Sequence, residues 1–212
     1  MTSAAALARA PEHSVEPLFI QRWSPRAFTG EELPEATLMS FFEAARWAPS
    51  AMNVQPWRFV YARRGTPAFE RFLSVLAPAN QAWASRAAAL IAVVSATTFT
   101  LPDRPGPVRS ESHSFDAGAA WAQLALQAEL SGWSTHAMGG FDRARADEAL
   151  AIPADHRLEV FVAVGRRGDP AGLPEWARKR ELPNGRKPVA ELVREGSFEG
   201  SRRRRASPPE LE

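Results

Sequence analysis

Three small polar side chains lie between two prolines in the stretch 48–59, at Ser50, Asn53 and Gln55. Pro49 ends any helix that precedes them, and Pro56 keeps Gln55 out of the α region, so the backbone here has little freedom. Asparagine and glutamine each carry a carbonyl acceptor and an amide donor, the pair that matches a planar heterocycle whose edge alternates C=O and N–H. The stretch is therefore a candidate for recognising such a ring. The alternative is an ordered turn whose side chains satisfy its own backbone.

Two arginines flank a serine near the start of the chain, at Arg22, Ser24 and Arg26. Pro25 biases Ser24 toward an extended conformation, so the three side chains are expected on one side of the backbone. Two guanidinium groups with a hydroxyl between them suit a phosphate, because arginine donates two parallel hydrogen bonds and keeps its charge. The alternative is a basic strand at the surface.

Other candidate positions occur later in the chain. Gly139 and Gly140 follow a short polar strand, and without a Cβ their backbone amides can come close to a ligand, although a Gly-Gly pair is also an ordinary turn signal. Arg186 and Lys187 place two cations in one turn. His113 has no carboxylate or second histidine at metal-ligand spacing, so we expect an ordinary surface histidine.

Helices and strands must hold these residues in place. A helix at 34–48 has its apolar positions at helical spacing and delivers the polar stretch at its C-terminal end. Strands are expected at 57–62, 87–96 and 158–165, and the last two are continuous apolar runs, typical of strands covered on both faces. Short helices are expected at 69–76, 143–151 and 189–194. Residues 97–110, which include three prolines, predict a surface loop or lid.

The strongest helix pattern covers residues 115–130. Alanine, leucine and tryptophan side chains make a broad apolar surface along it, and Gly132 is placed to end it. Such a surface needs cover nearly all round, which predicts a position in the middle of the domain or at a subunit interface.

Composition excludes several kinds of site and partner. The 212 residues contain no cysteine, which rules out disulfides, thiolate metal ligands and a cysteine nucleophile. Length and hydrophobic content predict one domain at 15–198, with disordered ends at 1–14 and 199–212. No apolar run reaches membrane-spanning length and no signal peptide is recognisable, so we expect a cytoplasmic protein without a membrane partner.

The high pI of about 9.6 comes from the C-terminal tail. Of 26 basic and 24 acidic residues, the tail holds the four arginines 202–205 and two glutamates, so the rest of the chain carries 22 of each sign. A neutral body without a basic stripe argues against nucleic-acid binding.

Together these motifs resemble the FMN-dependent nitroreductase family. The motifs that carry the resemblance, in chain order, are Arg22-x-Ser24-x-Arg26, Ser50-x-x-Asn53-x-Gln55, Asp116-x-Gly118, Gly139-Gly140-Phe141-Asp142 and Arg186-Lys187-Pro188. Their order and spacing match over roughly Phe19–Val193. The resemblance implies an α+β fold with a mostly antiparallel central sheet flanked by helices, and a homodimer with one FMN at each subunit interface.

The resemblance also implies a role for each candidate residue. The phosphate would be held by Arg22, Ser24, Arg26 and either Arg186 or Lys187, with Trp23 contributing only its backbone amide or its indole. The flavin ring would be held by Ser50, Asn53 and Gln55, and Gly139 and Gly140 would approach it near its reactive nitrogen. The chain has no G-x-G-x-x-G dinucleotide loop, so FMN is expected and FAD is not.

The chemistry implied is oxidation of NADH or NADPH and reduction of a nitroaromatic, quinone or related small electron-poor acceptor, in a ping-pong sequence through the flavin. No side chain needs to act as a catalytic acid or base, because the cofactor carries the reaction and the protein binds, orients and polarises it. The alternatives are a flavoenzyme of the same fold with a different acceptor, such as an enone, an aldehyde-type metabolite or a halogenated phenol, and a flavin-binding protein without turnover.

Overall fold

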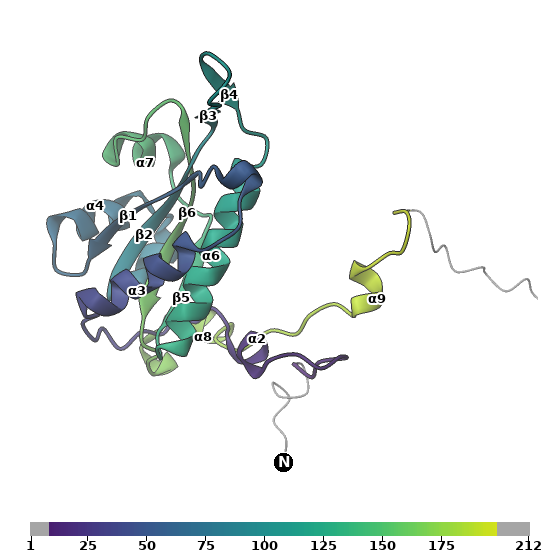
Figure 1. Cartoon of the computed structure of the whole chain (residues 1–212). Coiled ribbons are helices and arrows are strands. Elements are labelled where there is room, and N and C mark those ends of the chain that lie inside the picture. Colours follow the sequence, from purple (N-terminus) through teal and green to yellow (C-terminus); the bar gives the residue numbers. More distant parts are fainter. Residues whose placement is uncertain (1–8, 199–212) are drawn as a thin grey trace, which may run out of the picture. The chain divides into compact units, whose positions relative to one another are not determined.

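The computed structural model describes residues 9–198 of the chain (Figure 1). Glu16–Pro183 form one compact unit, the main body. The two ends of the chain form a second unit, which is described for residues 9–15 and 184–198. In that second unit the short helix α9 (Val189–Leu192) begins with the amide of Val189 donating to the Glu12 carboxylate at 3.1 Å. The expected disordered tail at 199–212 and residues 1–8 lie outside the described residues.

A four-stranded antiparallel sheet forms the centre of the main body (Figure 1). In spatial order its strands are β1 (Trp57–Arg63), β2 (Ala89–Ala96), β6 (His156–Gly165) and β5 (Ser134–Met138). The two continuous apolar runs of the sequence are the inner strands β2 and β6. Helices cover both faces, so seven of the eight residues of β2 and six of the ten residues of β6 are buried. The three predicted strands and the antiparallel sheet are confirmed.

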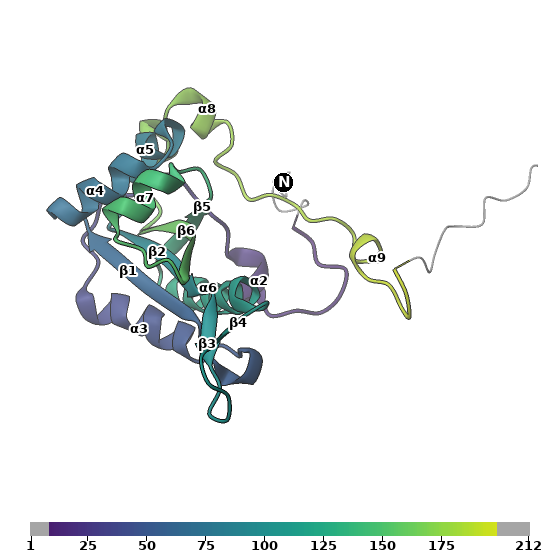
Figure 2. The same cartoon turned by 90° about the horizontal axis from the view of Figure 1, so that it is seen from above.

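Helices form a layer on each face of the sheet (Figure 2). One layer contains α3 (Glu35–Arg46) and α6 (His113–Leu130), and the other contains α4 (Pro67–Val75), α5 (Pro78–Ala84) and α7 (Arg143–Ala149). Each layer buries its own set of large side chains against the sheet. Fully burying one of these side chains stabilises the fold by about 1.5–3 kcal/mol. The helices predicted at 34–48, 69–76 and 143–151 are present, with ends shifted by at most two residues.

Helix α6 runs along the sheet and buries one stripe of small and aliphatic side chains. The stripe is Ala117, Ala120, Leu124 and Ala128. Gly132, with a φ of 76°, ends the helix as predicted, and the amide of Trp133 closes back on the carbonyl of Ala128 at 2.8 Å. Phe115 and Leu130 remain 82% and 67% exposed, so this chain covers only part of the apolar surface of the helix.

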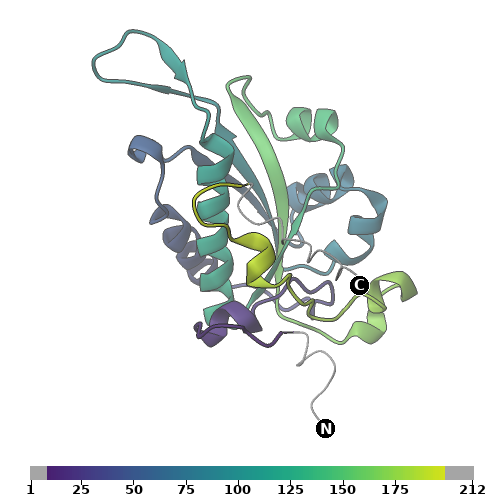
Figure 3. The same ribbon diagram turned by 90° about the vertical axis from the view of Figure 1, so that its right-hand side faces the viewer.

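Four segments differ from the sequence predictions. Residues 97–110 are not irregular: β3 (Thr98–Thr100) and β4 (Pro107–Arg109) pair as a hairpin that projects from the body near the start of α6 (Figure 3). The short helices α2 (Pro17–Gln21), α5 and α8 (Glu175–Arg178) were not predicted, because four to seven residues are too few to show helical periodicity. Two single 3₁₀ turns, Ala51–Asn53 and Pro170–Gly172, complete the elements of the described chain. Among residues 9–198, no helix is long and apolar enough to cross a membrane.

Candidate functional site

The segment 22–28 leaves helix α2 in an extended conformation. Arg22 has φ and ψ of −63° and 128°, and its Nη1 donates to the hydroxyl of Ser24 at 3.5 Å. Arg26 lies further on, with its Nη1 3.9 Å from the Glu181 carboxylate. Trp23 is half-buried between Arg22 and Ser24. The expected alternation thus brings Arg22 and Ser24 into contact, whereas Arg26 faces a carboxylate that the sequence pattern did not indicate.

Residues from distant parts of the chain fix the backbone of this segment. One oxygen of Glu181 accepts hydrogen bonds from the amides of Arg26 at 2.7 Å and Ala27 at 2.8 Å. The carbonyl of Pro25 accepts from Nδ1 of His136 at 3.0 Å. Sequence reasoning missed both residues because they lie 155 and 111 positions away from their partners, with no local pattern to link them. These hydrogen bonds fix the backbone of the segment, so it is not a free strand at the surface.

A second connection holds the far end of the segment. Phe28 forms an antiparallel bridge with Arg167, and the amide of Gly168 donates to the carbonyl of Ala27 at 2.9 Å. A Cβ on Gly168 would lie 2.8 Å from the backbone carbon of Phe28, so only glycine allows the two chains to approach this closely.

The pKa of His136 is lowered from 6.5 to about 4, mainly because burial disfavours the imidazolium, and the nearby positive charges of Arg26 and Arg22 add to this. The hydrogen bond to Pro25 acts in the opposite direction and is the smaller effect. At neutral pH the ring is therefore uncharged, and Nδ1–H is the donor that Pro25 receives. The ring also packs against Trp83, with centroids 4.6 Å apart.

This pKa predicts a loss of stability in acid. The unfolded chain takes up a proton near pH 6.5 and the folded chain only near pH 4, so stability falls as the pH drops through that window. We expect the histidine to lower the free energy of unfolding by about 2 kcal/mol at about pH 5 relative to about pH 7.5. Denaturant unfolding at both pH values measures it, with His136→Gln as the control that keeps a donor for Pro25 but does not titrate. An equal loss in parent and variant would contradict the prediction.

The polar stretch after α3 is a tight turn with three residues at positive φ: Met52, Asn53 and Gln55, at 52°, 54° and 53°. The hydroxyl of Ser50 accepts from the amide of Gln55 at 2.9 Å, and Nε2 of Gln55 donates to the carbonyl of Asn53 at 3.0 Å. As Pro56 predicts, Gln55 is outside the right-handed α region, but it is left-handed and not extended.

The contacts within this stretch are those of the ordered turn, and ring binding stays a prediction. Ser50 and Gln55 each satisfy the turn, yet the Ser50 hydroxyl keeps its proton and Gln55 keeps its side-chain carbonyl. The side chain of Asn53 is exposed and has no hydrogen-bond partner among the described residues. A donor, an acceptor and a complete amide thus remain for a ligand on a backbone that is already fixed.

Asp116 fastens this turn to helix α6. Its carboxylate is buried, 3% exposed, and accepts from the amide of Ala51 at 3.2 Å and from the hydroxyl of Ser112 at 2.9 Å. The sequence marked Asp116 only as part of a motif. Its structural task is to set the position of the turn relative to the first turn of the helix.

His113 is not the surface histidine that we expected. Its side chain is 16% exposed, and Nδ1 lies 2.8 Å from the hydroxyl of Ser95. Because Ser95 donates its one proton to Glu159 at 2.6 Å, the proton between Ser95 and His113 must come from the imidazole. The carboxylate partner lies on β6, 46 positions along the chain, so sequence spacing could not reveal the cluster. Ser95 also pairs with Trp57, and the cluster therefore supports the strand that leaves the polar turn.

The two glycines after β5 differ in their surroundings. The carbonyl of Gly140 accepts from the amide of Ala77 at 3.0 Å and from Nδ2 of Asn80 at 2.9 Å, and a Cβ at Gly140 would lie 3.0 Å from the same nitrogen. A Cβ at Gly139 would meet open space. Gly140 thus holds the turn in place, and Gly139 is the glycine that a ligand could approach.

Arg186 and Lys187 belong to the second unit, where both are exposed. Arg186 donates from Nη1 to the carbonyls of Asn184 at 3.2 Å and Gly185 at 2.9 Å. Their contribution to a phosphate site therefore remains a prediction from the sequence.

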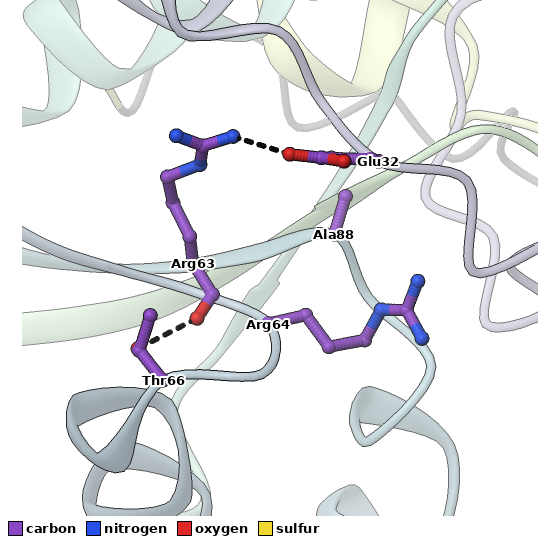
Figure 4. A pocket seen from close by; sticks show the side chains of 5 residues that line it. All are labelled: Glu32, Arg63, Arg64, Thr66 and Ala88. Atoms are coloured by element: carbon purple, nitrogen blue, oxygen red, sulfur yellow. Dashed lines mark hydrogen bonds and ion pairs between the residues drawn. The ribbon is translucent and has the colours of Figure 1, made fainter.

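A separate pocket lies at the other end of β1, away from the polar turn (Figure 4). Its lining residues are Glu32, Arg63, Arg64, Thr66 and Ala88. Arg63 donates to Glu32 at 2.8 Å, Arg64 bonds the carbonyl of Gly30, and Thr66 donates to the carbonyl of Arg63 at 2.7 Å. Because both cations are already engaged by acceptors of this chain, we do not assign the pocket to the cofactor.

The structure does not bring the two polar segments together within one chain. Asp116 holds the turn 50–55 beside the first turn of α6, whereas the segment that ends at Phe28 is joined through Arg167 to Glu129 in the last turn of the same helix.

Residues 9–198 contain no cluster of histidines and carboxylates that could hold a metal ion. They do offer cations and a hydroxyl on the fixed segment 22–26, and ring-edge groups on the fixed turn 50–55. These are the groups that a flavin phosphate and a flavin ring need.

Comparison with known proteins also points to flavin-containing oxidoreductases. A provisionally named NADH dehydrogenase/NAD(P)H nitroreductase of Streptomyces coelicolor is 29% identical over 198 residues, covering 86% of this chain and 96% of the relative. A solved structure described as an oxidoreductase containing FMN superposes with a TM-score of 0.88 at 43% identity, covering 95% of this chain and 100% of that chain. A provisionally named nitroreductase of Desulfovibrio desulfuricans in complex with FMN gives 0.67 at 25% identity, covering 87% and 99%. Residues 20–166 match the nitroreductase family as a whole, and the chain belongs to that family.

Proposed function

We propose that the protein is an FMN-dependent oxidoreductase that takes electrons from NADH or NADPH and reduces small electron-poor acceptors such as nitroaromatics or quinones. The observation that carries this proposal is the pair of prearranged polar segments, 22–26 and 50–55, in a chain 43% identical to an oxidoreductase containing FMN. FMN would supply the redox chemistry by accepting a hydride and passing two electrons on.

The segment 22–26 would bind the phosphate. The Arg22 guanidinium lies beside the Ser24 hydroxyl, whose own proton is not used in that contact, and Arg26 adds a second positive charge. Charge-assisted hydrogen bonds of this kind are about twice as strong as neutral ones. Arg186 or Lys187 would add a cation, as the family motif implies.

The turn 50–55 would bind the edge of the flavin ring. Asn53 offers both a donor and an acceptor, and Ser50 and Gln55 add the groups that the turn leaves unused. Fixed donors beside a ring that gains negative charge stabilise that charge without rearranging, and this favours reduction. Gly139 leaves open space next to its own backbone, where the ring could approach.

We expect valine at position 139 to block the flavin but not folding. The added side chain would meet open space in the protein itself and would occupy the volume proposed for the ring. FMN affinity should fall by about tenfold or more, which corresponds to about 1.4 kcal/mol, with unfolding unchanged. Gly172→Val is the matched control, because Gly172 is also exposed and also faces open space. Equal FMN affinity in the parent and Gly139→Val would remove Gly139 from the site.

A homodimer with FMN at the subunit interface is part of the proposal. Three large apolar side chains are exposed: Phe19 on α2 at 54%, Phe115 on α6 at 82% and Leu130 on α6 at 67%. Exposing this apolar surface to water is unfavourable for a monomer. A two-fold interface would bury this surface on both copies at once. Light scattering at micromolar protein tests it, and a monomer that retains flavin would contradict the interface site.

Steady-state kinetics with several acceptors tests the activity. NADH or NADPH should be oxidised only with flavin bound, and parallel double-reciprocal lines should mark a ping-pong sequence. A low rate with nitroaromatics and quinones but a high rate with enones, aldehydes or halogenated phenols would assign the protein to the alternative acceptors. Bound flavin without oxidation of either nicotinamide would indicate a flavin-binding protein without turnover.

A further inference from the structure

Glu181 is a buried carboxylate in an unusual position. It lies three residues after α8, its side chain is 2% exposed, and its main contacts are with a segment 155 residues earlier in the sequence. One oxygen accepts from the amides of Arg26 at 2.7 Å and Ala27 at 2.8 Å. The other oxygen is buried without a hydrogen-bond partner among the described residues.

This arrangement is costly for the fold. A buried carboxylate needs hydrogen bonds and a counter-charge, and buried polar atoms in folded proteins are nearly always paired. Glu181 has two amide donors on one oxygen, but its nearest cation, Arg26 Nη1, lies at 3.9 Å, beyond hydrogen-bond distance. The guanidinium of Arg26 is therefore attracted by the carboxylate charge but donates no hydrogen bond to it.

Glu181 determines how the segment 22–26 orients its side chains toward a ligand. Two successive amides on one oxygen fix the backbone at Arg26 and Ala27, and the hydrogen bond from His136 fixes the carbonyl of Pro25. With these points held, Arg22 and Ser24 stay in contact and the donors of Arg26 remain available to an anion.

We propose that Glu181 is a positioning residue that gives the site its selectivity for a phosphorylated flavin over the neutral riboflavin. It acts through the oxygen that holds the two amides, and its negative charge is secondary. This inference rests on the proposed FMN function. It attributes part of the affinity for the FMN phosphate to a residue that does not touch the phosphate.

Three variants of Glu181 separate the effect of the position of its acceptor oxygen from the effect of its negative charge. Glu181→Gln keeps an acceptor oxygen at the same length but loses the charge. Glu181→Asp keeps the charge, but it withdraws the carboxylate by one methylene and loses at least one of the two amides. Glu181→Ala loses both, and where it fails to fold the other two carry the test. Glu175→Gln is the matched control, because Glu175 is exposed and forms its ion pair with another exposed residue, Lys179, at 2.6 Å.

The measurement is the ratio of riboflavin to FMN dissociation constants for the flavin-free protein, which isolates the phosphate and is insensitive to a general loss of stability. We expect this ratio to stay within about threefold of the parent in Glu181→Gln and Glu175→Gln. It should fall by about tenfold or more in Glu181→Asp and Glu181→Ala, as expected for weakened hydrogen bonds to a charged group.

The opposite pattern, a preserved ratio in Glu181→Asp and a reduced one in Glu181→Gln, would overturn the proposal in favour of a charge effect on Arg26. An unchanged ratio in all variants would overturn it outright. A parent that binds neither flavin would overturn the proposed function and this inference together. A parent that prefers FMN leaves the function standing whichever way Glu181 behaves.

Discussion

Replacing both Arg22 and Arg26 by alanine should lower FMN affinity by about two to four powers of ten. Each guanidinium is expected to contribute about 1.5–3 kcal/mol as a charge-assisted donor to a dianionic phosphate. Riboflavin affinity should change little, because riboflavin has no phosphate for these side chains to bind. Quenching of flavin fluorescence on binding to the flavin-free protein measures both affinities.

The control for this pair removes the same charge elsewhere. Arg71 on α4 and Arg145 on α7 lie in the layer on the opposite face of the sheet from α6, and both are exposed. The double variant Arg71→Ala, Arg145→Ala should bind FMN like the parent. Since Arg26→Ala leaves the Glu181 carboxylate without its nearest cation, unfolding should be measured on the same samples. FMN affinity within threefold of the parent in the Arg22, Arg26 variant would place the phosphate elsewhere.

Replacing Asp116 by alanine should release the turn that is proposed to hold the flavin ring. The amide of Ala51 and the hydroxyl of Ser112 would lose their shared carboxylate acceptor, and we expect a loss of about 3 kcal/mol in the free energy of unfolding. Affinity should fall for FMN and riboflavin alike, because the ring and not the phosphate is affected. Denaturant unfolding and the two dissociation constants measure these effects.

The variant Asp116→Asn should be measured alongside Asp116→Ala. It keeps one acceptor oxygen without the charge and should recover part of both losses. Glu70→Ala on the exposed side of α4 removes a carboxylate of no expected consequence and serves as the control. A variant with alanine at 116 that is as stable as the parent and binds both flavins normally would mean that the turn holds its position without this anchor.

Local patterns in the sequence predicted much of the fold because the physics behind them is local. The runs at 87–96 and 158–165 have the pattern of strands covered on both faces, and they form the two inner strands. The helix at 115–130 and its end at Gly132 follow from apolar spacing and from the freedom of glycine at positive φ. The proline-rich stretch 97–110 lies at the surface as predicted, but its hairpin was missed because three residues per strand are too few to show alternation.

The parts of the site that could not be predicted are those made by contacts between distant residues. Arg26 with Glu181 and His136 with Pro25 join positions more than one hundred residues apart. His113 was misjudged for the same reason, since its cluster combines α6 with Ser95 on β2 and Glu159 on β6. The residues that we propose to touch the ligand lie in short motifs, whereas the residues that hold those motifs in position leave no pattern in the sequence.

The most direct test of the account is the visible spectrum of the purified protein under anaerobic conditions, before and after addition of NADH or NADPH. We expect the absorption of an oxidised flavin, its loss on addition of one of the two nicotinamides, and its return when a nitroaromatic or quinone is added. The flavin released on denaturation should be FMN. A protein that carries FAD, or that stays colourless after incubation with FMN, would contradict the assignment of the segments 22–26 and 50–55 to an FMN site.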